Sequence, residues 1–246
     1  MQLGMFNRAR YYVSLGDSIS IDAYAGGPGR GAASLLLKNR NEDFPDWQGR
    51  DLSSALPGAR LIPLAMDGAT SATVRYAQIP RLKEMNIRPE IITLTIGGND
   101  LVQTFGADDL TEDTLNHLRS NLTATLDSLR QIAGDEAPIL LGTIYDPSDG
   151  TGNAGELNIS VWPTALEWLE RFNDTLKIAA QTHDCLLADI HQHFLGHGAT
   201  VGSPSQSDSR PANRDLWFCG TIEPNAWGAS EVRRVWWETL QAAGKL

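Results

Sequence analysis

The segment YYVSLGDS, residues 11–18, carries the first sign of the fold. Tyr11 to Leu15 is a short run of apolar and β-forming residues, and Gly16 ends it. Four later runs have the same form: Arg60 to Ala65, Glu90 to Ile96, Pro138 to Tyr145 and Cys185 to Ile190. Each run is mostly apolar on both faces, which is typical of parallel strands that are covered on both sides. We therefore expect a five-stranded parallel sheet.

Segments with helical periodicity alternate with these runs. In Thr111 to Ile132, the longest, leucines recur at spacings of three and four residues. The others are Ala32 to Asn39, Val74 to Lys83 (which contains Pro80), Pro163 to Thr182 and Ala226 to Ala243. This alternation predicts an α/β fold, a doubly wound three-layer α/β/α sandwich. The length of 246 residues fits a single domain over residues 1–246.

Composition narrows the classes of partner. The net charge of −10 argues against nucleic acid and anionic membranes. No stretch is long and apolar enough to span a membrane, and Met1 to Arg10 lacks the apolar core of a secretory signal, so we expect a cytoplasmic protein. Cys185 and Cys219 lie far apart and fit ordinary thiols, without the spacing of a disulfide framework or a zinc site. The oligomeric state cannot be predicted from these features.

The turns that follow the predicted strands are the places to look for a site, because open α/β sheets bind ligands at the carboxyl ends of their strands. Three of these turns carry unusual residues: Gly16-Asp17-Ser18, Asp67-Gly68-Ala69-Thr70 and Ile96-Gly97-Gly98-Asn99-Asp100. A serine can present its hydroxyl there, a glycine leaves its N–H open to a ligand, and an asparagine offers a donor to a developing oxyanion. Taken alone, each motif is more simply a helix cap or a plain turn.

Together the three motifs are more specific. Ser18, Gly68 and Asn99 come in order, each one turn past a predicted strand, and they resemble blocks I, II and III of the SGNH hydrolase superfamily, the GDSL-type esterases and lipases. The resemblance extends from the first predicted strand to the final helix. It implies an SGNH or flavodoxin-like sandwich with Ser18 as the nucleophile. It also implies an oxyanion hole made by the Ser18 amide, the Gly68 amide and the Asn99 side chain, and a reaction that needs no cofactor.

The fourth block of the family departs from its usual form. It is an Asp-x-x-His followed by Pro, and the matching segment here is GTIEPN, residues 220–225. Gly220 stands in the Asp position and Glu223 in the His position. A histidine with a pKa of about 6.5 suits proton transfer at neutral pH, whereas a glutamate of about 4.3 is a weaker base unless burial raises its pKa.

Three readings of the base remain open. In the first, Glu223 is the base, with a pKa raised by a dry pocket. In the second, a histidine of the segment HQHFLGH, residues 191–197, takes over. His197 is flanked by glycines and suits a loop that points into a cleft, whereas His191 and His193 fit surface or capping positions. In the third, the chain has lost its activity and only binds a ligand.

Two further segments belong near the site. The run GGPGRG, residues 26–31, contains Pro28 and lacks the Lys-Ser/Thr ending of a phosphate loop. We interpret it as a loop beside the nucleophile that lines the acyl or alcohol pocket, with Arg30 either holding an acidic substrate group or, more simply, solvated. Because no phosphate-cradling turn follows the first strand directly, a flavodoxin-like nucleotide binder is disfavoured. The polar segment Gly202 to Arg214 predicts a surface loop near the site or partial disorder.

The sequence thus predicts a serine esterase that acts on a small-molecule ester, either a small or a carbohydrate-linked acyl ester, through an acyl-enzyme on Ser18. The alternative is a catalytically degenerate SGNH-fold ligand-binding protein, since a fold alone does not carry a function. The identity of the ester cannot be read from the sequence.

Overall fold

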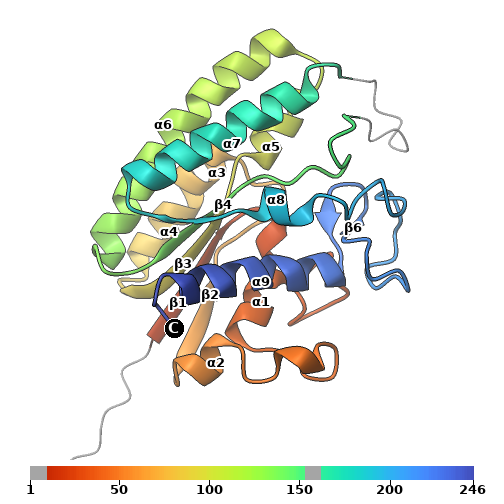
Figure 1. Ribbon diagram of the computed structural model, residues 1–246. Helices are drawn as coiled ribbons and strands as arrows, with labels where there is room; N and C mark the ends of the chain where they lie inside the picture. Colours follow the sequence, from red (N-terminus) through yellow and green to blue (C-terminus); the bar gives the residue numbers. More distant parts are fainter. Residues whose placement is uncertain (1–9, 153–161) are drawn as a thin grey trace, which may run out of the picture.

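The computed structural model describes residues 10–152 and 162–246 (Figure 1). Five parallel strands form one sheet in the order β2-β1-β3-β4-β5. They are β1 (Arg10–Gly16), β2 (Ala59–Pro63), β3 (Pro89–Thr95), β4 (Ile139–Gly142) and β5 (Leu186–Ala188). The predicted α/β fold is confirmed, and every strand overlaps a run that was assigned to it from the sequence.

Helices cover both faces of the sheet (Figure 1). On one face lie α1 (Ala32–Leu37), α2 (Leu52–Ala55) and α9 (Ala226–Ala242). On the other lie α3 (Ser71–Thr73), α4 (Ile79–Glu84), α6 (Asp108–Ala133) and α7 (Ala165–Thr182). Because successive side chains of a strand point to opposite faces, Tyr12 and Ile91 enter the core under α9 while Val13 and Ile92 enter the core under α6. This is why the strands are apolar on both sides.

The site lies where the chain changes the side of the sheet to which it adds strands. After β1 it adds β2 on one side of β1, and it then adds β3 on the other side. The connection from β1 to β2 runs through α1 on one face, and the connection from β2 to β3 runs through α4 on the other. The carboxyl ends of β1 and β3 therefore border the crevice where open α/β sheets bind ligands. Three short elements begin or pack there: η1 (Ser18–Ser20), α5 (Gly98–Val102) and α8 (Ile190–Phe194).

Two local features differ from the sequence-based expectation. The segment expected as one helix from Val74 to Lys83 is divided into a π-helical turn η3 (Val74–Gln78) and α4, and the short helix α3 precedes it. Pro80 falls in the first turn of α4, where its missing N–H is not needed. A second, unexpected sheet is the antiparallel pair β6 (Phe218–Cys219) and β7 (Glu223–Pro224). Its two-residue strands are too short to give a periodic pattern.

The remaining short helix is η2 (Pro45–Trp47), which precedes α2. In residues 10–152 and 162–246, no helix combines the length and the apolar character needed to cross a bilayer.

Candidate active site

Ser18 opens η1 directly after β1 and is 7% exposed. Asp17 holds the start of this turn, since its Oδ1 accepts the Ile19 N–H at 3.2 Å and the Thr95 hydroxyl at 2.8 Å. Thr95 also contacts the Ser20 hydroxyl at 3.0 Å. The turn that carries Ser18 is thus tied to the end of β3, and its backbone has little freedom.

Gly16 makes this close approach possible. Its φ is +114°, and a Cβ at this position would lie 1.8 Å from the carbonyl oxygen of Thr95. Gln78, at the end of the π-helical turn, pairs with both backbone groups of Gly16: its Oε1 accepts the Gly16 N–H at 2.8 Å, and its Nε2 donates to the Gly16 oxygen at 2.8 Å. The strand exit before the serine is therefore fixed from two sides.

Gly68 lies at the exposed turn after β2. Its φ is +67°, and no atom lies within 4 Å of the position that a Cβ would take. In the described residues no acceptor is recorded for the N–H of Gly68 or of Ser18. Both amides are therefore available to an incoming oxygen atom.

Asn99, in the first turn of α5, supplies a third donor. Its Nδ2 donates to the Ala69 oxygen at 3.1 Å, which leaves one N–H of the amide for a ligand. The loop after β2 and the loop after β3 are tied together next to Asn99, because Asp100 accepts both the Ser71 N–H at 2.8 Å and the Ser71 hydroxyl at 2.5 Å. A Cβ on Gly98, next to Asn99, would lie 4.0 Å from the Asp17 carboxyl, so this loop also borders the serine turn.

Glu223 reaches the same place from the β6–β7 hairpin. The Ser18 hydroxyl lies close enough to the Glu223 carboxyl to lower the pKa of that carboxyl. Burial raises the pKa of Glu223 to about 7, against the effect of the Ser18 hydroxyl, and the neighbouring Asp17 and Asp67 raise it further. In the described part of the chain, Oε2 of this carboxyl is buried without a hydrogen-bond partner. A carboxyl of this kind takes up a proton near neutral pH.

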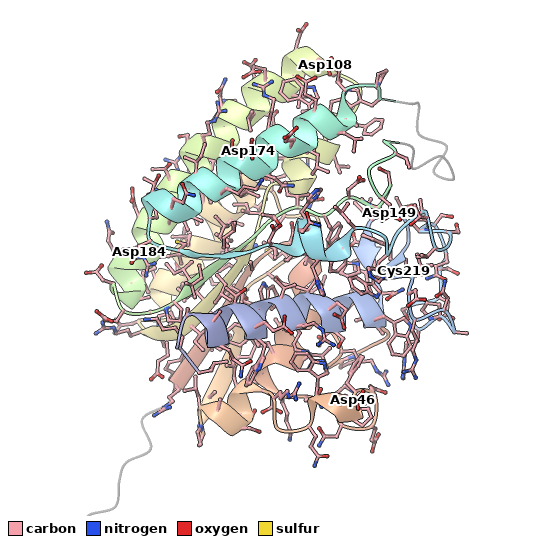
Figure 2. The ribbon with its side chains drawn as sticks, in the orientation of Figure 1. Asp46, Asp108, Asp149, Asp174, Asp184 and Cys219 are labelled. Atoms are coloured by element: carbon pink, nitrogen blue, oxygen red, sulfur yellow. The ribbon has the colours of Figure 1, made fainter. Side chains whose placement is uncertain are left out.

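The hairpin is held by its neighbours. Cys219, labelled in Figure 2, pairs with Glu223 across the two strands. In the turn between them, Gly220 N–H donates to the Gln206 oxygen and Thr221 N–H to the Pro204 oxygen, both at 2.7 Å. These contacts confirm that the polar segment Gly202 to Arg214 lies beside the site.

Backbone strain marks the same turn. Thr221 has a φ of +102°, which is rare for a β-branched residue. Such a conformation persists only where the surroundings fix it, and it often accompanies a functional site. The hydroxyl of Tyr145 adds a further constraint, because it donates to the carbonyl oxygen of Ile222, directly before Glu223.

The histidines after β5 are engaged elsewhere. His191 Nδ1 contacts the Ile144 oxygen at 3.0 Å, and His193 Nε2 contacts Glu231 at 2.9 Å. The His197 ring stacks on Trp217 with a centroid distance of 3.4 Å, and its Nδ1 lies 2.8 Å from the Asp215 oxygen. Among the described residues, no contact between a histidine and Ser18 or Glu223 is recorded. The structure brings a carboxyl to Ser18, as in the first of the three readings.

Three side chains at the site carried no signal in the sequence. Gln78 and Tyr145 act on backbone groups, and Tyr24 donates its hydroxyl to Asp67 at 2.9 Å across the mouth of the site. None of them lies in a recognisable motif, and only their spatial neighbours reveal them. Within residues 10–152 and 162–246, no group of three or more His, Cys, Asp or Glu side chains is arranged to hold a metal ion.

Comparison with protein families gives one match over most of the chain. The model of the GDSL-like Lipase/Acylhydrolase family matches residues 14–229, which include the serine turn, both donor loops and the hairpin. No curated protein matches the chain.

Solved structures with the same fold include two that are described as acetylxylan esterases. A catalytic mutant of Axe2, an acetylxylan esterase from Geobacillus stearothermophilus, superposes with a TM-score of 0.65 at 15% identity and covers 94% of each chain. The acetyl xylan esterase AlAXEase gives a TM-score of 0.62 at 16% identity, over 94% of this chain and 99% of that one. TesA gives 0.57 at 20% identity, over 95% and 99%. At these identities the likeness establishes the fold.

Proposed function

The chain belongs to the GDSL-like lipase/acylhydrolase family, and from this premise we propose that it is a serine esterase that cleaves small or carbohydrate-linked acyl esters through an acyl-enzyme on Ser18. The observation that carries the proposal is the largely buried Glu223 carboxyl beside the Ser18 hydroxyl, with a pKa raised to about 7. A base whose pKa lies near the working pH combines a useful deprotonated fraction with a useful basicity.

In the first step Glu223 takes the proton of the Ser18 hydroxyl. The Oγ atom then forms a bond to the ester carbonyl carbon, and the carbonyl oxygen becomes the negatively charged oxygen of a tetrahedral intermediate. The Ser18 and Gly68 amides and the free N–H of Asn99 supply hydrogen bonds to this oxygen. Because these donors are already fixed by the loops around them, they need not reorganise as the charge develops.

The intermediate collapses when the bond to the alcohol oxygen breaks. The protonated Glu223 gives its proton to that oxygen, and the neutral alcohol leaves. Water then donates a proton to Glu223 while its oxygen attacks the acyl carbon, and the proton passes back to Ser18 as the acid is released. Each turnover returns both side chains to their starting forms.

The hairpin takes over the task that a third residue performs in a Ser-His-Asp arrangement. There an acid fixes the tautomer and the orientation of the imidazole. A carboxyl has no tautomer to select, so a glycine at position 220 in place of the acid is consistent with Glu223 as base. Its orientation is set by the pairing with Cys219 and by the bond from Tyr145 to Ile222.

The substrate class is supported by fold similarity. Two of the structural neighbours are described as acetylxylan esterases, which act on acyl groups attached to a sugar chain. The half-exposed Asn99 and the exposed Gly68 leave the oxyanion position open to a bulky alcohol.

A fluorophosphonate probe tests the nucleophile directly. Ser18 Oγ is expected to displace fluoride and form a stable bond to phosphorus, detected as an added mass on the Ser18 peptide. Ser18→Ala should lose the label and the hydrolysis of 4-nitrophenyl acetate, while Ser120→Ala, an exposed serine on α6, should keep both. Labelling that persists in folded Ser18→Ala would place the nucleophile elsewhere.

The departure of the fourth block from its usual form favours one alternative, a binding protein that has lost its activity. It predicts no covalent label and no cleavage of any ester in a panel of short-chain and sugar acetates. In that case ligand binding by the unmodified protein becomes the function to seek.

A further inference from the structure

The glycine-rich segment GGPGRG, residues 26–31, is crossed by arginines from three parts of the chain. A Cβ on Gly26 would lie 3.2 Å from Cγ of Arg210, and a Cβ on Gly29 would lie 3.6 Å from Nη1 of Arg40. Arg30 folds back over the same loop and donates from Nη1 to the Gly26 oxygen at 2.8 Å. The glycines thus leave room for the arginine side chains to lie close against the backbone.

The three guanidinium groups converge on Asp43. Arg30 Nε and Arg40 Nε donate to its Oδ2 at 3.0 and 2.8 Å, and Arg210 Nη2 lies 3.0 Å from its Oδ1. The arginines hold the pKa of Asp43 down at about 2, although burial acts in the opposite direction. The carboxylate therefore stays ionised and orients three cations at one point.

Most of the N–H donors in this cluster are still available. A guanidinium has five N–H groups, and in the described residues the recorded acceptors for these three side chains are the Asp43 carboxylate and the Gly26 oxygen. The side chains are 22%, 37% and 38% exposed for Arg30, Arg40 and Arg210. Water reaches these donors, and so can a ligand.

Three further carboxylates adjoin the cluster, and the recorded partners of Asp22 and Asp208 are backbone amides, so the guanidinium N–H groups are not taken up by them. Asp22 lies under the loop, where its two oxygens accept the Gly29 and Gly31 amides at 2.8 Å. Asp208 accepts the backbone N–H of Arg210 at 2.9 Å. Glu42 lines the rim of a cleft of ≈ 580 Å³ that opens beside Gly29 and Arg40.

Contacts with backbone atoms on two sides connect the segments of the cluster to the elements around the Ser18 site. Cys219, which pairs with Glu223, contacts the Tyr24 oxygen at 3.5 Å, and Tyr24 lies two residues before Gly26, the start of the glycine-rich segment. On the other side, Ser209, which precedes Arg210, accepts the N–H of Ala226 at 2.8 Å. The glycine-rich segment and Ser209 therefore link the arginine cluster to the Glu223 hairpin and to the start of α9.

We propose that Arg30, Arg40 and Arg210 form a subsite for an anionic group, a carboxylate or a phosphate, on the alcohol part of the ester. The subsite replaces the simpler expectation of a solvated Arg30. Arginine binds both kinds of anion through paired, charge-assisted hydrogen bonds, and Asp43 fixes the donors in advance. As a statement about substrate, the inference rests on the esterase function proposed above.

The test compares three acetylated methyl glucosides that differ only at C6, which carries a hydroxyl, a carboxylate or a phosphate. At least one anionic ester should be cleaved with a kcat/KM about tenfold above that of the neutral one, as expected for a charged hydrogen bond. Arg40→Gln and Arg210→Gln should each reduce this preference severalfold. Arg81→Gln, an exposed arginine on the opposite layer, should leave it unchanged. The anionic ester that is cleaved with the higher kcat/KM shows whether the subsite prefers a carboxylate or a phosphate.

Equal kcat/KM for all three esters in the unmodified protein, or a preference that survives in both arginine variants, would overturn the subsite. If no ester is cleaved and Ser18 takes no fluorophosphonate, the esterase function fails instead. The subsite is then decided by calorimetric binding of free glucuronate and inorganic phosphate. Binding that weakens in Arg40→Gln and Arg210→Gln supports the subsite, and the absence of binding contradicts it.

Discussion

The Ser18 hydroxyl faces a carboxyl, that of Glu223, and burial holds the pKa of this carboxyl at about 7. A glutamate in water would be fully ionised at neutral pH and would attract the serine proton weakly. At the start of β7, where water is partly excluded and Asp17 and Asp67 lie nearby, the same side chain becomes a much stronger base. Its environment therefore moves a glutamate into the range in which a histidine normally works.

Esterase activity should rise with pH through about 7, because Glu223 must be deprotonated to accept the Ser18 proton. A histidine base would give a similar profile, so the profile alone does not identify the group. Glu223→Gln should remove nearly all activity, while His197→Ala should keep it. The measurement is kcat/KM for 4-nitrophenyl acetate between about pH 5 and pH 9. Full activity in Glu223→Gln would exclude the carboxyl as base.

Asn99→Ala should lower kcat about 10²–10³-fold, as the loss of one oxyanion donor does in other hydrolases. The KM should change little, because the hydrogen bond strengthens only as the negative charge develops. Asn116→Ala, at an exposed position on α6, serves as the control for a generic change of asparagine. A variant at position 99 that loses less than threefold in kcat would show that its side chain does not contact the oxyanion.

Tyr145→Phe removes the donor to the Ile222 oxygen and should loosen the placement of Glu223. We expect kcat to fall about tenfold, since a small misplacement of a catalytic group is costly. Stability should fall by about 1 kcal/mol, because the carbonyl loses its partner in a partly buried place. Tyr76→Phe, at an exposed position, is the matched control. Unchanged kinetics in Tyr145→Phe would mean that the strand pairing alone positions the base.

Glu223→Gln should also change how stability depends on pH. The folded pKa of about 7 lies above the ordinary value of 4.5, so folding favours the protonated form. Below about pH 4.5 the carboxyl is protonated in both states and does not lower the free energy of unfolding. Between about pH 4.5 and 7 the free energy of unfolding falls as pH rises, and above about pH 7 the loss is complete at roughly 3 kcal/mol. The variant cannot ionise and should gain stability relative to the unmodified protein over this range. Urea unfolding at about pH 4.5 and pH 8 measures the difference, and identical pH dependence of the two proteins would contradict a buried carboxyl.

Gly16→Ala should destabilise the fold by more than about 3 kcal/mol, because its Cβ would overlap the Thr95 oxygen and its φ is +114°. Gly49→Ala separates the two causes, since Gly49 also has a positive φ, +77°, but no atom within 4 Å of the place that a Cβ would occupy. Its cost should be about 1–2 kcal/mol. Equal losses in the two variants, measured by denaturant unfolding, would show that the contact with β3 is not tight.

The sheet and the donor loops could be predicted because their signals are local. Each strand is a continuous apolar run that ends at a turn residue, and the serine, glycine and asparagine motifs follow the strands directly. The position of Glu223 could be assigned by its place before the final helix. The effectiveness of Glu223 as a base could not be predicted, because its pKa depends on burial and on Asp17 and Asp67, which precede it by more than 150 residues.

What escaped prediction depends on contacts between distant segments. The β6–β7 hairpin has two-residue strands with no periodicity, and it is fixed by hydrogen bonds to the polar loop at Pro204 and Gln206. The arginine cluster joins Arg30 and Arg40 to Arg210 through one aspartate, and no spacing rule connects them. His197 looked suited to a cleft by its glycine neighbours, yet its ring stacks on Trp217.

The replacement of imidazole by a carboxyl also changes the charge that the site carries through a turnover. A histidine base becomes a cation when it takes the serine proton, whereas Glu223 becomes neutral, so the oxyanion forms with only N–H dipoles to balance it. At the end of the cycle the released acid loses its proton beside the carboxylates of Glu223 and Asp67, which repel it. We therefore expect the site to favour an uncharged acyl group over the anion made from it, and inhibition by the acid product should be weak.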